Sequence, residues 1–279
     1  MNPHASHPTS FSALLRGLWI NRALIFQMSR REVLGRYKGS ILGLLWSFLN
    51  PLLMLSVYTF FFAVVFKSRW GGTVTEVTES KTQFAVILFA GMIVHSLFSE
   101  VLSRAPGLIL SNINYVKKVV FPLEILAVIS MLTALFHSMV SIFVLLIVFV
   151  AFNGYLHWTV IFLPLVIIPF VSLIMGLAWI LASVGVYVRD VGQSIGLAMT
   201  VLMFLSPVFY PVSALPSFLQ PWIMLNPLTI IIEQVREVVV WGQMPNWSYL
   251  GLYALIALFV SWIGFAWFQK TRKGFADVV

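Results

Sequence analysis

The sequence of 279 residues contains no cysteine, and only 9% of its residues are charged. The absence of cysteine excludes disulfide frameworks and thiolate sites. A soluble globular domain averages about 25% charged residues, whereas here 60% of the residues are hydrophobic. This composition predicts an integral membrane protein. The net charge of +8 would suggest nucleic-acid binding only in a soluble protein, so we expect no nucleic-acid partner.

The sequence also lacks the motifs of ATP hydrolysis and of metal binding. No segment matches GxxxxGK[ST], so the chain is predicted not to hydrolyse ATP through a P-loop. No HExxH motif, cysteine cluster or paired-histidine spacing indicates a metal site. Residues 192–196 match the nucleophile-elbow pattern GxSxG, but the pattern needs a preceding strand and Asp and His partners. Close helix packing through Gly192 and Gly196 is the favoured interpretation, and we expect no catalytic residue.

Apolar blocks of about 20 residues or more recur along the chain, and each is long enough to cross the hydrocarbon of a bilayer. They predict an all-α integral membrane protein with a six-helix transmembrane domain over residues 39–279. The expected spans are residues 41–66, 84–102, 123–152, 159–188, 191–212 and 249–268. Pro51 interrupts the first span and should kink it.

The N-terminal region differs from the spans. Residues 1–10 are polar and predict a disordered tail. Residues 11–38 predict an amphipathic helix, because apolar residues such as Leu14 and Leu18 fall on one side of a helical wheel and Arg16 falls opposite. Such a helix lies on the membrane surface rather than crossing it. The alternative is a helix that packs on other protein.

Residues 213–247 break the apolar pattern, because prolines cut them into two pieces of roughly 14 residues that are too short to cross a bilayer. The second piece also carries Glu233, Arg236 and Glu237, which a lipid-facing helix would not tolerate. We predict two short helices that dip into or rest on one membrane face. The three charged residues lie one helical turn apart, and we expect an exposed pair among them to contribute little stability.

Basic residues are divided unequally between the two sides that an even number of spans creates. Thirteen Lys and Arg residues share a side with both termini, and four lie on the other side. Because Lys and Arg concentrate in cytoplasmic loops, we expect both termini in the cytoplasm. The same rule places the loop of residues 104–122 in the cytoplasm and residues 213–247 outside.

The cytoplasmic segment Ser111–Pro122 carries the only adjacent lysine pair of the chain, Lys117 and Lys118. A basic loop between two spans offers a soluble partner a place to push on the membrane domain. The alternative is that these lysines hold lipid headgroups and fix the orientation of the chain.

Ionisable residues are few within the spans. His95, His137, Glu100 and Glu124 are the groups that a proton-coupled transporter would use. No carboxylate lies in the middle of a span, so hydrogen bonding across helices is the favoured role for these four side chains.

Aromatic residues are abundant, with 24 Phe, 10 Trp and 8 Tyr. Rings near span ends usually mark the interfacial belt, which is the favoured interpretation together with packing. The alternative is a set of rings that lines a passage and slides along the apolar faces of sugars. The candidates for such a channel are Tyr58, Phe62, Phe204, Phe209 and Tyr210.

Short motifs occur in order along nearly the whole chain. They are Arg31-Glu32; Arg36–Ser40 with Leu42-Gly43, Trp46 and Pro51; Asn112, Asn114, Lys118, Phe121-Pro122 and Glu124; Arg189-Asp190; Ser206–Tyr210; Asn226-Pro227; Glu233 with Arg236; and Lys273–Asp277. In this order and spacing they resemble the permease subunit of type 2 ABC exporters, in the branch that exports lipid-linked polysaccharides such as O-antigen and teichoic acid. Leu123 and Ala127 depart from the resemblance, because relatives often have Arg and Pro there.

The resemblance implies ATP-driven export of an undecaprenyl-linked, O-antigen-like polysaccharide across the bacterial cytoplasmic (inner) membrane. It implies a homodimer of this chain around a central channel, with two ABC ATPase subunits that bind ATP and Mg, so that this chain needs no cofactor. Expected ATPase-docking residues are Arg16, Arg30, Arg31, Ser111, Asn112, Asn114, Tyr115, Lys117 and Lys118. Expected outer-gate residues are Glu233, Arg236 and Glu237, and expected helix breaks lie at Pro51, Pro207 and Pro227.

Two other functions remain open. A type 2 exporter of teichoic acid or of small hydrophobic molecules would share the same motifs but would not depend on the same glycan-synthesis machinery. A membrane-embedded glycolipid transferase is less favoured, because it needs acid–base residues that face a cavity.

Overall fold

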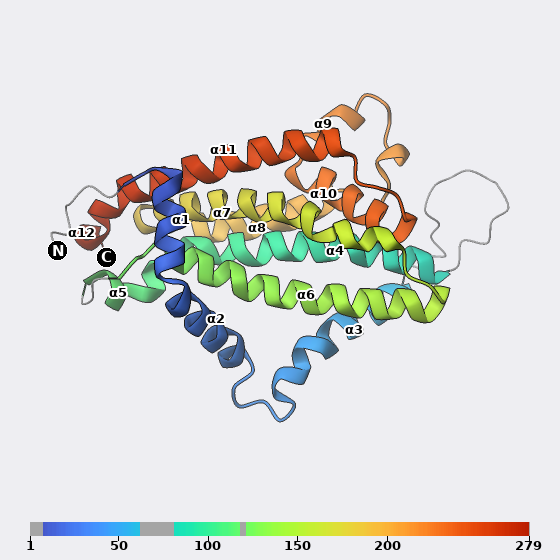
Figure 1. The fold of residues 1–279 in the computed structure, drawn as a ribbon, viewed down its shortest axis with the longest axis horizontal. Coiled ribbons are helices and arrows are strands. Elements are labelled where there is room, and N and C mark those ends of the chain that lie inside the picture. The colour runs from blue at the N-terminus through green and yellow to red at the C-terminus, as the bar shows by residue number, and fades with distance from the viewer. Residues whose placement is uncertain (1–7, 62–80, 118–120, 279) are drawn as a thin grey trace.

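The computed structural model describes residues 8–61, 81–117 and 121–278, and within these ranges the chain forms helices and turns without a strand (Figure 1). This confirms the predicted all-α class. Four parts of the sequence-based expectations lie outside the described residues: residues 1–7 of the predicted tail, residues 62–66 at the end of the first predicted span, the channel candidate Phe62 and the docking candidate Lys118.

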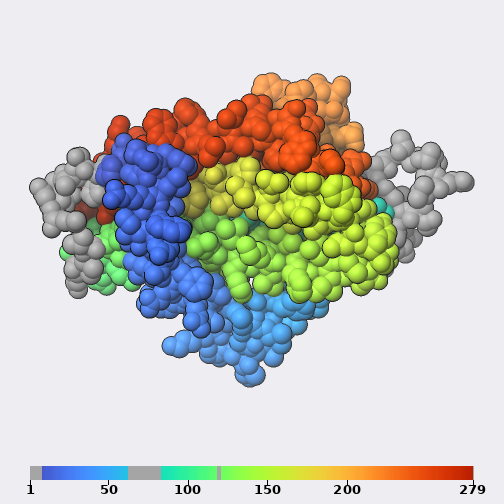
Figure 2. All heavy atoms as spheres, viewed as in Figure 1, coloured from blue at the N-terminus to red at the C-terminus, as the bar shows by residue number. Residues whose placement is uncertain are grey.

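Two helices rather than one follow the N-terminus: α1 (Phe11–Ile20) and α2 (Arg22–Arg36). The Ser10 side chain caps α1 by accepting a hydrogen bond from the backbone N–H of Ala13. Asn21 separates the helices, because its side-chain amide donates to the Gly17 carbonyl at 2.8 Å and ends the first helix locally. In Figures 1 and 2, α1 runs across one end of the long helices as a surface layer, and α2 runs away from it toward α3.

The long helices are α3 (Trp46–Tyr58), α4 (Lys81–Arg104), α6 (Ile125–Asn153), α7 (Leu163–Tyr187) and α11 (Trp247–Thr271). With the turns that extend some of them, these five are long and apolar enough to cross a membrane. Helix α8 (Val191–Leu205) has 15 residues, or about 22 Å at 1.5 Å per residue, which is less than the roughly 30 Å of hydrocarbon. Six spans therefore stay a prediction.

Helix α8 ends earlier than the predicted span of residues 191–212. The backbone turns extended at Ser206 (φ −97°, ψ 151°), and Pro207 follows. The residue before a proline is disfavoured in the helical conformation, which accounts for the break at this position.

Helix α4 occupies the centre of the bundle and α3 its edge. In the most apolar stretch of each helix, 78% of the residues of α4 are buried but only 11% of those of α3. Helix α4 packs against α3, α6, α7, α8 and α10. It therefore connects the elements that carry most of the candidate functional residues.

Glycine contacts join α7 to α11, the most extensive helix pair. A Cβ atom on Gly264 would lie 2.1 Å from the carbonyl oxygen of Gly176, so the two backbones approach more closely than any side chain allows. The packing predicted for Gly192 and Gly196 is wrong within this chain, because a Cβ on either would meet no atom within 4 Å. These two glycines face open space on α8.

Short elements gather at the two ends of the bundle. Helices α5 (Ile113–Lys117) and α12 (Phe275–Val278) lie beside α1 at one end, and α9 (Gln220–Met224) and α10 (Pro227–Arg236) lie toward the other (Figure 1). Helix α10 continues into the π-helical turn Glu237–Trp241, and Gly242, with φ +66°, ends it. A short 3₁₀ segment, Trp158–Phe162, precedes α7 at that same end.

Candidate functional site

Arg236, in the last turn of α10, is fully buried. Its guanidinium donates to three backbone carbonyls: Ile87 of α4 at 3.2 Å, Pro207 at 2.7 Å and Val208 at 2.9 Å. It also pairs with the carboxylate of Glu233 at 2.9 Å. We call this set the Arg236 cluster. It joins α10, α4 and the segment after α8 through one side chain.

Gly91 of α4 provides the room for this guanidinium. A Cβ atom at residue 91 would lie 2.9 Å from Nη2 of Arg236 and 3.4 Å from the Cα of Val208. Distances below 3.0 Å are not tolerated by real Cβ atoms, so any larger side chain would displace either the guanidinium or the backbone after α8.

The expectation of an exposed pair at Glu233, Arg236 and Glu237 is therefore wrong. The break after α8 leaves backbone carbonyls without helical partners. The buried guanidinium of Arg236 donates hydrogen bonds to two of these carbonyls. Glu233 is half-buried, and one carboxylate oxygen of Glu237 is buried without a hydrogen-bond partner in the described ranges. Their role as an outer gate stays a prediction.

Asn226 ties the start of α10 to the end of α8. Its Oδ1 accepts from the backbone N–H of Leu228, as expected for a helix-capping residue followed by proline. Its Nδ2 donates to the hydroxyl of Ser206 at 2.9 Å. The predicted breaks at Pro207 and Pro227 thus lie on either side of one hydrogen-bonded junction, while Pro51 lies inside α3.

Helix α2 is tied to α4 by two ion pairs of opposite polarity. Arg36 pairs with Glu100 at 2.5 Å, and Glu32 pairs with Arg104. The partners are four residues apart on each helix, so the two pairs lie one turn apart. The imidazole Nδ1 of His137, on α6, lies 2.8 Å from Arg36 and 3.2 Å from Glu100. We call these five residues the ion-pair ladder.

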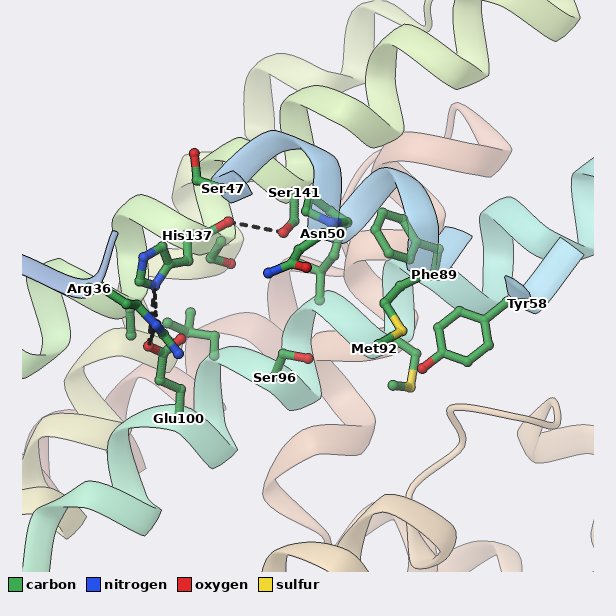
Figure 3. Close-up of a pocket in the computed structure, with 16 residues that line it drawn as sticks. Arg36, Ser47, Asn50, Tyr58, Phe89, Met92, Ser96, Glu100, His137 and Ser141 are labelled. Carbon is green, nitrogen blue, oxygen red and sulfur yellow. Dashed lines mark hydrogen bonds and ion pairs between the residues drawn. The ribbon is translucent and has the colours of Figure 1, made fainter. Parts of the chain in front are cut away.

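A cavity of about 220 Å³ with a mixed polar and apolar lining opens between α3, α4 and α6, and Arg36, Glu100 and His137 of the ladder form part of its wall (Figure 3). Figure 3 shows Arg36, Glu100 and His137 at one end and Tyr58 with Phe89 at the other. Its remaining polar wall consists of Ser47, Asn50, Ser96, Ser138 and Ser141. Hydroxyl and amide groups around an aromatic ring can bind sugars, which need both hydrogen bonds and an apolar face.

Tyr37 contacts the ion-pair ladder through His137. Its ring packs edge-on against His137, with centroids 6.1 Å apart. Burial raises the pKa of the Tyr37 phenol, while the nearby Arg36 opposes the shift. The phenol therefore stays protonated and neutral beside the charged groups.

The predicted channel residues fall in two places. Tyr58 lines the cavity next to α4. Phe204 and Phe209 stack with centroids 5.8 Å apart at the end of α8, and Tyr210 donates to the carbonyl of Phe204 at 3.1 Å. Both α3 and α8 pack on α4. Among the described residues, the Tyr58 ring does not pack against the rings at the end of α8. Their channel role stays a prediction.

The predicted docking residues are mostly exposed. Ser111, Asn114 and Lys117 are exposed, whereas Asn112 and Tyr115 are half-buried. The ring of Tyr115 stacks on that of Phe121, with centroids 4.4 Å apart. Arg16, Arg30 and Arg31 are exposed on α1 and α2. Of these two helices, α1 lies at the end of the bundle that carries α5, whereas α2 leads away from that end (Figure 1).

The segment after α5 is anchored to the C-terminal helices. Arg272 pairs with Glu124 at 2.7 Å and donates to the carbonyl of Phe121 at 2.6 Å. The Trp179 indole donates to the carbonyl of Glu124 at 3.0 Å. His95 of α4 lies 3.1 Å from the carbonyl of Met199 on α8. These contacts confirm that the ionisable residues of the spans bond across helices.

Sequence reasoning missed Glu32, Arg104, Gly91 and Asn50 as parts of these sites. Glu32 and Arg104 are 72 residues apart in the sequence, so no local pattern joins them. The one available signal was that Glu32 belongs to the motif Arg31-Glu32 and that Arg104 follows the predicted span of residues 84–102. The sequence does not show which residue a lone glycine or asparagine within an apolar helix will contact.

Comparison with known proteins places the chain in a family. The model of the ABC-2 type transporter family matches residues 23–240. The O-antigen export system permease protein of Myxococcus xanthus is 26% identical over 95% of this chain and 99% of the relative. An O-antigen export system permease protein of Klebsiella pneumoniae is 24% identical over 92% of this chain and 95% of the relative. The polysialic acid transport protein of Escherichia coli is 26% identical over 88% and 93%.

The family match covers the whole Arg236 cluster and the whole ion-pair ladder, since all of these residues lie within residues 23–240. The apolar helices agree with a multi-pass membrane protein. The chain belongs to the ABC-2 type transporter family.

Proposed function

We propose that this chain is the permease subunit of an ATP-driven exporter that moves an undecaprenyl-linked, O-antigen-like polysaccharide across the bacterial inner membrane. One observation carries the proposal: the match to an O-antigen export permease covers 95% of this chain and 99% of the relative. The cavity lined by Tyr58, serines and Asn50 supports it, because a passage for sugars needs hydroxyl-binding groups within an apolar domain.

The energy comes from a separate ABC ATPase, because the chain has no P-loop. ATP and Mg bind to that subunit, and two copies of it dock on two copies of this chain. The exposed Ser111, Asn114 and Lys117 beside α1 support docking at this end. The thirteen-to-four division of Lys and Arg supports a cytoplasmic position for both termini and for the docking end.

Motion passes from the docking end into the bundle through α4. Helix α4 leads directly into the segment before α5, and the ion-pair ladder ties it to α2. At its other end α4 contacts the Arg236 cluster. A displacement of α5 would thus tilt α4 and shift the junction between α8 and α10, where the passage opens.

Deletion of the gene tests the function. We expect lipid-linked glycan to accumulate inside the cell and surface polymer to disappear, as measured by gel analysis of surface polysaccharide and by extraction of lipid-linked glycan. Complementation with the wild-type gene is the control. Normal surface polymer in the deletion strain would overturn the proposal.

Charge reversal tests docking. Lys117→Glu should weaken co-purification of the ATPase about tenfold, since losing one charge contact and adding repulsion costs on the order of 1–2 kcal/mol. Membrane insertion should persist. Lys270→Glu, an equal change at an exposed residue of α11, is the control. Altered topology with full ATPase binding would instead assign Lys117 to orientation.

The match to a polysialic acid transport protein favours a second cargo, a polysialic-acid-like polysaccharide. The same deletion strain separates the two. Loss of a polysialic-acid-like surface polymer with intact O-antigen would select the second cargo.

A further inference from the structure

A groove of about 530 Å³ lies between the surface helix α1 and the end of α11, at the same end of the bundle as α5 (Figure 1) but lined by none of the predicted loop residues Ser111–Lys117. Helix α1 contributes Ser12, Arg16 and Ile20, and α11 contributes Phe265 and Gln269, with Glu124 at the same groove. The groove therefore combines a cation, a carboxylate, an amide and an apolar wall.

Gln269 is the second observation at this groove. Its exposed fraction is only 4%, and its Oε1 has no hydrogen-bond partner in the described part of the chain. A buried acceptor without a hydrogen-bond partner costs free energy, and because Gln269 lines the groove, a hydrogen-bond donor bound there would relieve this cost.

The charges of the groove select a zwitterion. Arg16 is exposed and free to bind a phosphate. The Glu124 carboxylate, held by Arg272 at 2.7 Å, and Oε1 of Gln269 are acceptors that suit an ammonium group. A phosphate and an ammonium on one small molecule are the headgroup of an amine-bearing phospholipid.

The surroundings of the groove suit the acyl chains of a lipid. On α1, Leu15, Trp19 and Ile20 are 54%, 70% and 65% exposed, so this helix presents apolar side chains to its surroundings. Near the end of α11, Trp262 and Trp267 are also exposed. Exposed aromatic and aliphatic residues around a surface helix are typical of the membrane interface.

We propose that the groove between α1 and α11 binds one glycerophospholipid with a primary amine in its headgroup. Arg16 binds the phosphate, and Glu124 with Gln269 accepts the ammonium hydrogens. The lipid pins α1 to the bundle on a side where α1 has few protein contacts of its own, its one buried residue being Leu14. This site does not depend on the identity of the exported cargo.

Native mass spectrometry tests the site on the full chain with its co-purified partners. The probes are phosphatidylethanolamine, phosphatidylcholine and phosphatidylglycerol with identical acyl chains. Phosphatidylcholine keeps the phosphate but has no N–H donor, and phosphatidylglycerol has no amine. We expect about tenfold stronger retention of phosphatidylethanolamine, the effect of one charge-assisted hydrogen bond.

Two variants assign the contacts. Arg16→Gln should lower retention of all three lipids about tenfold, since it removes the phosphate partner. Gln269→Met should remove the preference for phosphatidylethanolamine over phosphatidylcholine. Arg189→Gln, an equal change at an exposed residue that does not line the groove, should leave retention unchanged.

Three results would overturn the proposal. Equal retention of all three lipids by the wild-type chain would mean unselective contact with bulk lipid. Stronger retention of phosphatidylglycerol would mean an anionic-lipid site. Unchanged retention in Arg16→Gln, which alters an exposed side chain and does not threaten folding, would reject the assigned phosphate contact even if Gln269→Met fails to fold.

Discussion

A fully buried guanidinium within an apolar bundle is tolerated only where fixed acceptors replace water around it. At Arg236 these acceptors are mostly backbone carbonyls, and two of them belong to Pro207 and Val208, directly after α8. The single side chain thus holds a helix break in one geometry. Its loss would leave carbonyls without donors and would free α10 from the end of α8.

Replacing Arg236 with Met tests this role. We expect Arg236→Met to lower the free energy of unfolding by about 3 kcal/mol or more, as when one partner of a buried network is removed. Thermal unfolding of the purified chain in detergent measures the change. Glu233→Gln is the matched control, because Glu233 is half-buried and its loss should cost about 1 kcal/mol. Equal losses in the two variants would contradict the cluster.

Gly91 provides an independent test at the same place. Gly91→Ala puts a Cβ 2.9 Å from the Arg236 guanidinium, so we expect a lower unfolding temperature despite the better helix propensity of alanine. Gly251→Ala, on α11, is the control, because a Cβ there meets no atom within 4 Å. It should be neutral or stabilise by up to about 1 kcal/mol. Equal changes of the unfolding temperature in the two variants would show that the Arg236 guanidinium moves aside without cost.

Among the elements, α2 and α4 form the pair best placed to move together. The ion-pair ladder crosses between them twice, with the positive charge on α2 in one pair and on α4 in the other. Reversed polarity fixes the register, because a shift of one turn would place like charges opposite each other. The pairs are partly exposed, so each contributes only about 1 kcal/mol to stability.

A charge exchange tests whether the ladder transmits motion. Glu32→Arg and Arg104→Glu should each lower export of the polymer, because like charges then face each other across α2 and α4. The double variant should export about tenfold more polymer than either single variant, a difference within the usual range of pairwise coupling energies. Surface polymer per molecule of membrane-inserted protein is the measurement. Double and single variants that are equally impaired would mean that the residues act separately.

The helices themselves could be predicted, because a run of apolar residues has to form a helix to satisfy its backbone in a bilayer. The ends of helices could not always be predicted. Asn21 divides the predicted surface helix through a local bond to Gly17, and the turn at Ser206 shortens α8. Hydropathy does not record such bonds, since Val208 and Phe209 continue the apolar run beyond the break.

The sequence showed which residues of the candidate site form hydrogen bonds, but it did not show which residues they bond to. Hydrogen bonding across helices was expected for Glu100 and His137, and the structure confirms it. Their shared partner, Arg36, lies 64 residues before Glu100 and was assigned to a separate surface helix. The burial of Arg236 was unpredictable for a related reason: its acceptors are carbonyls, which every residue carries.

At the scale of the whole molecule, α8 leaves most of its surface uncovered, with Met199 as its one buried residue. It exposes Leu197, Val201 and Phe204, while Gly192 and Gly196 face open space. An exposed apolar face with small residues lets a second helix approach closely in a membrane. A second copy of this chain, as proposed for the exporter, would cover this face and enclose a passage beside α3 and α8.

The absence of cysteine allows a direct test of that arrangement. A single cysteine introduced as Leu197→Cys, on the open face of α8, should form a disulfide-linked dimer when native membranes are oxidised. Leu258→Cys, on an exposed face of α11, is the control and should remain monomeric. A disulfide needs Cα atoms within about 7 Å, so cross-linking at residue 197 alone would place α8 of both copies at the centre of the dimer. Cross-linking at residue 258 alone would place α11 there, and the passage along α3 and α8 would then face lipid.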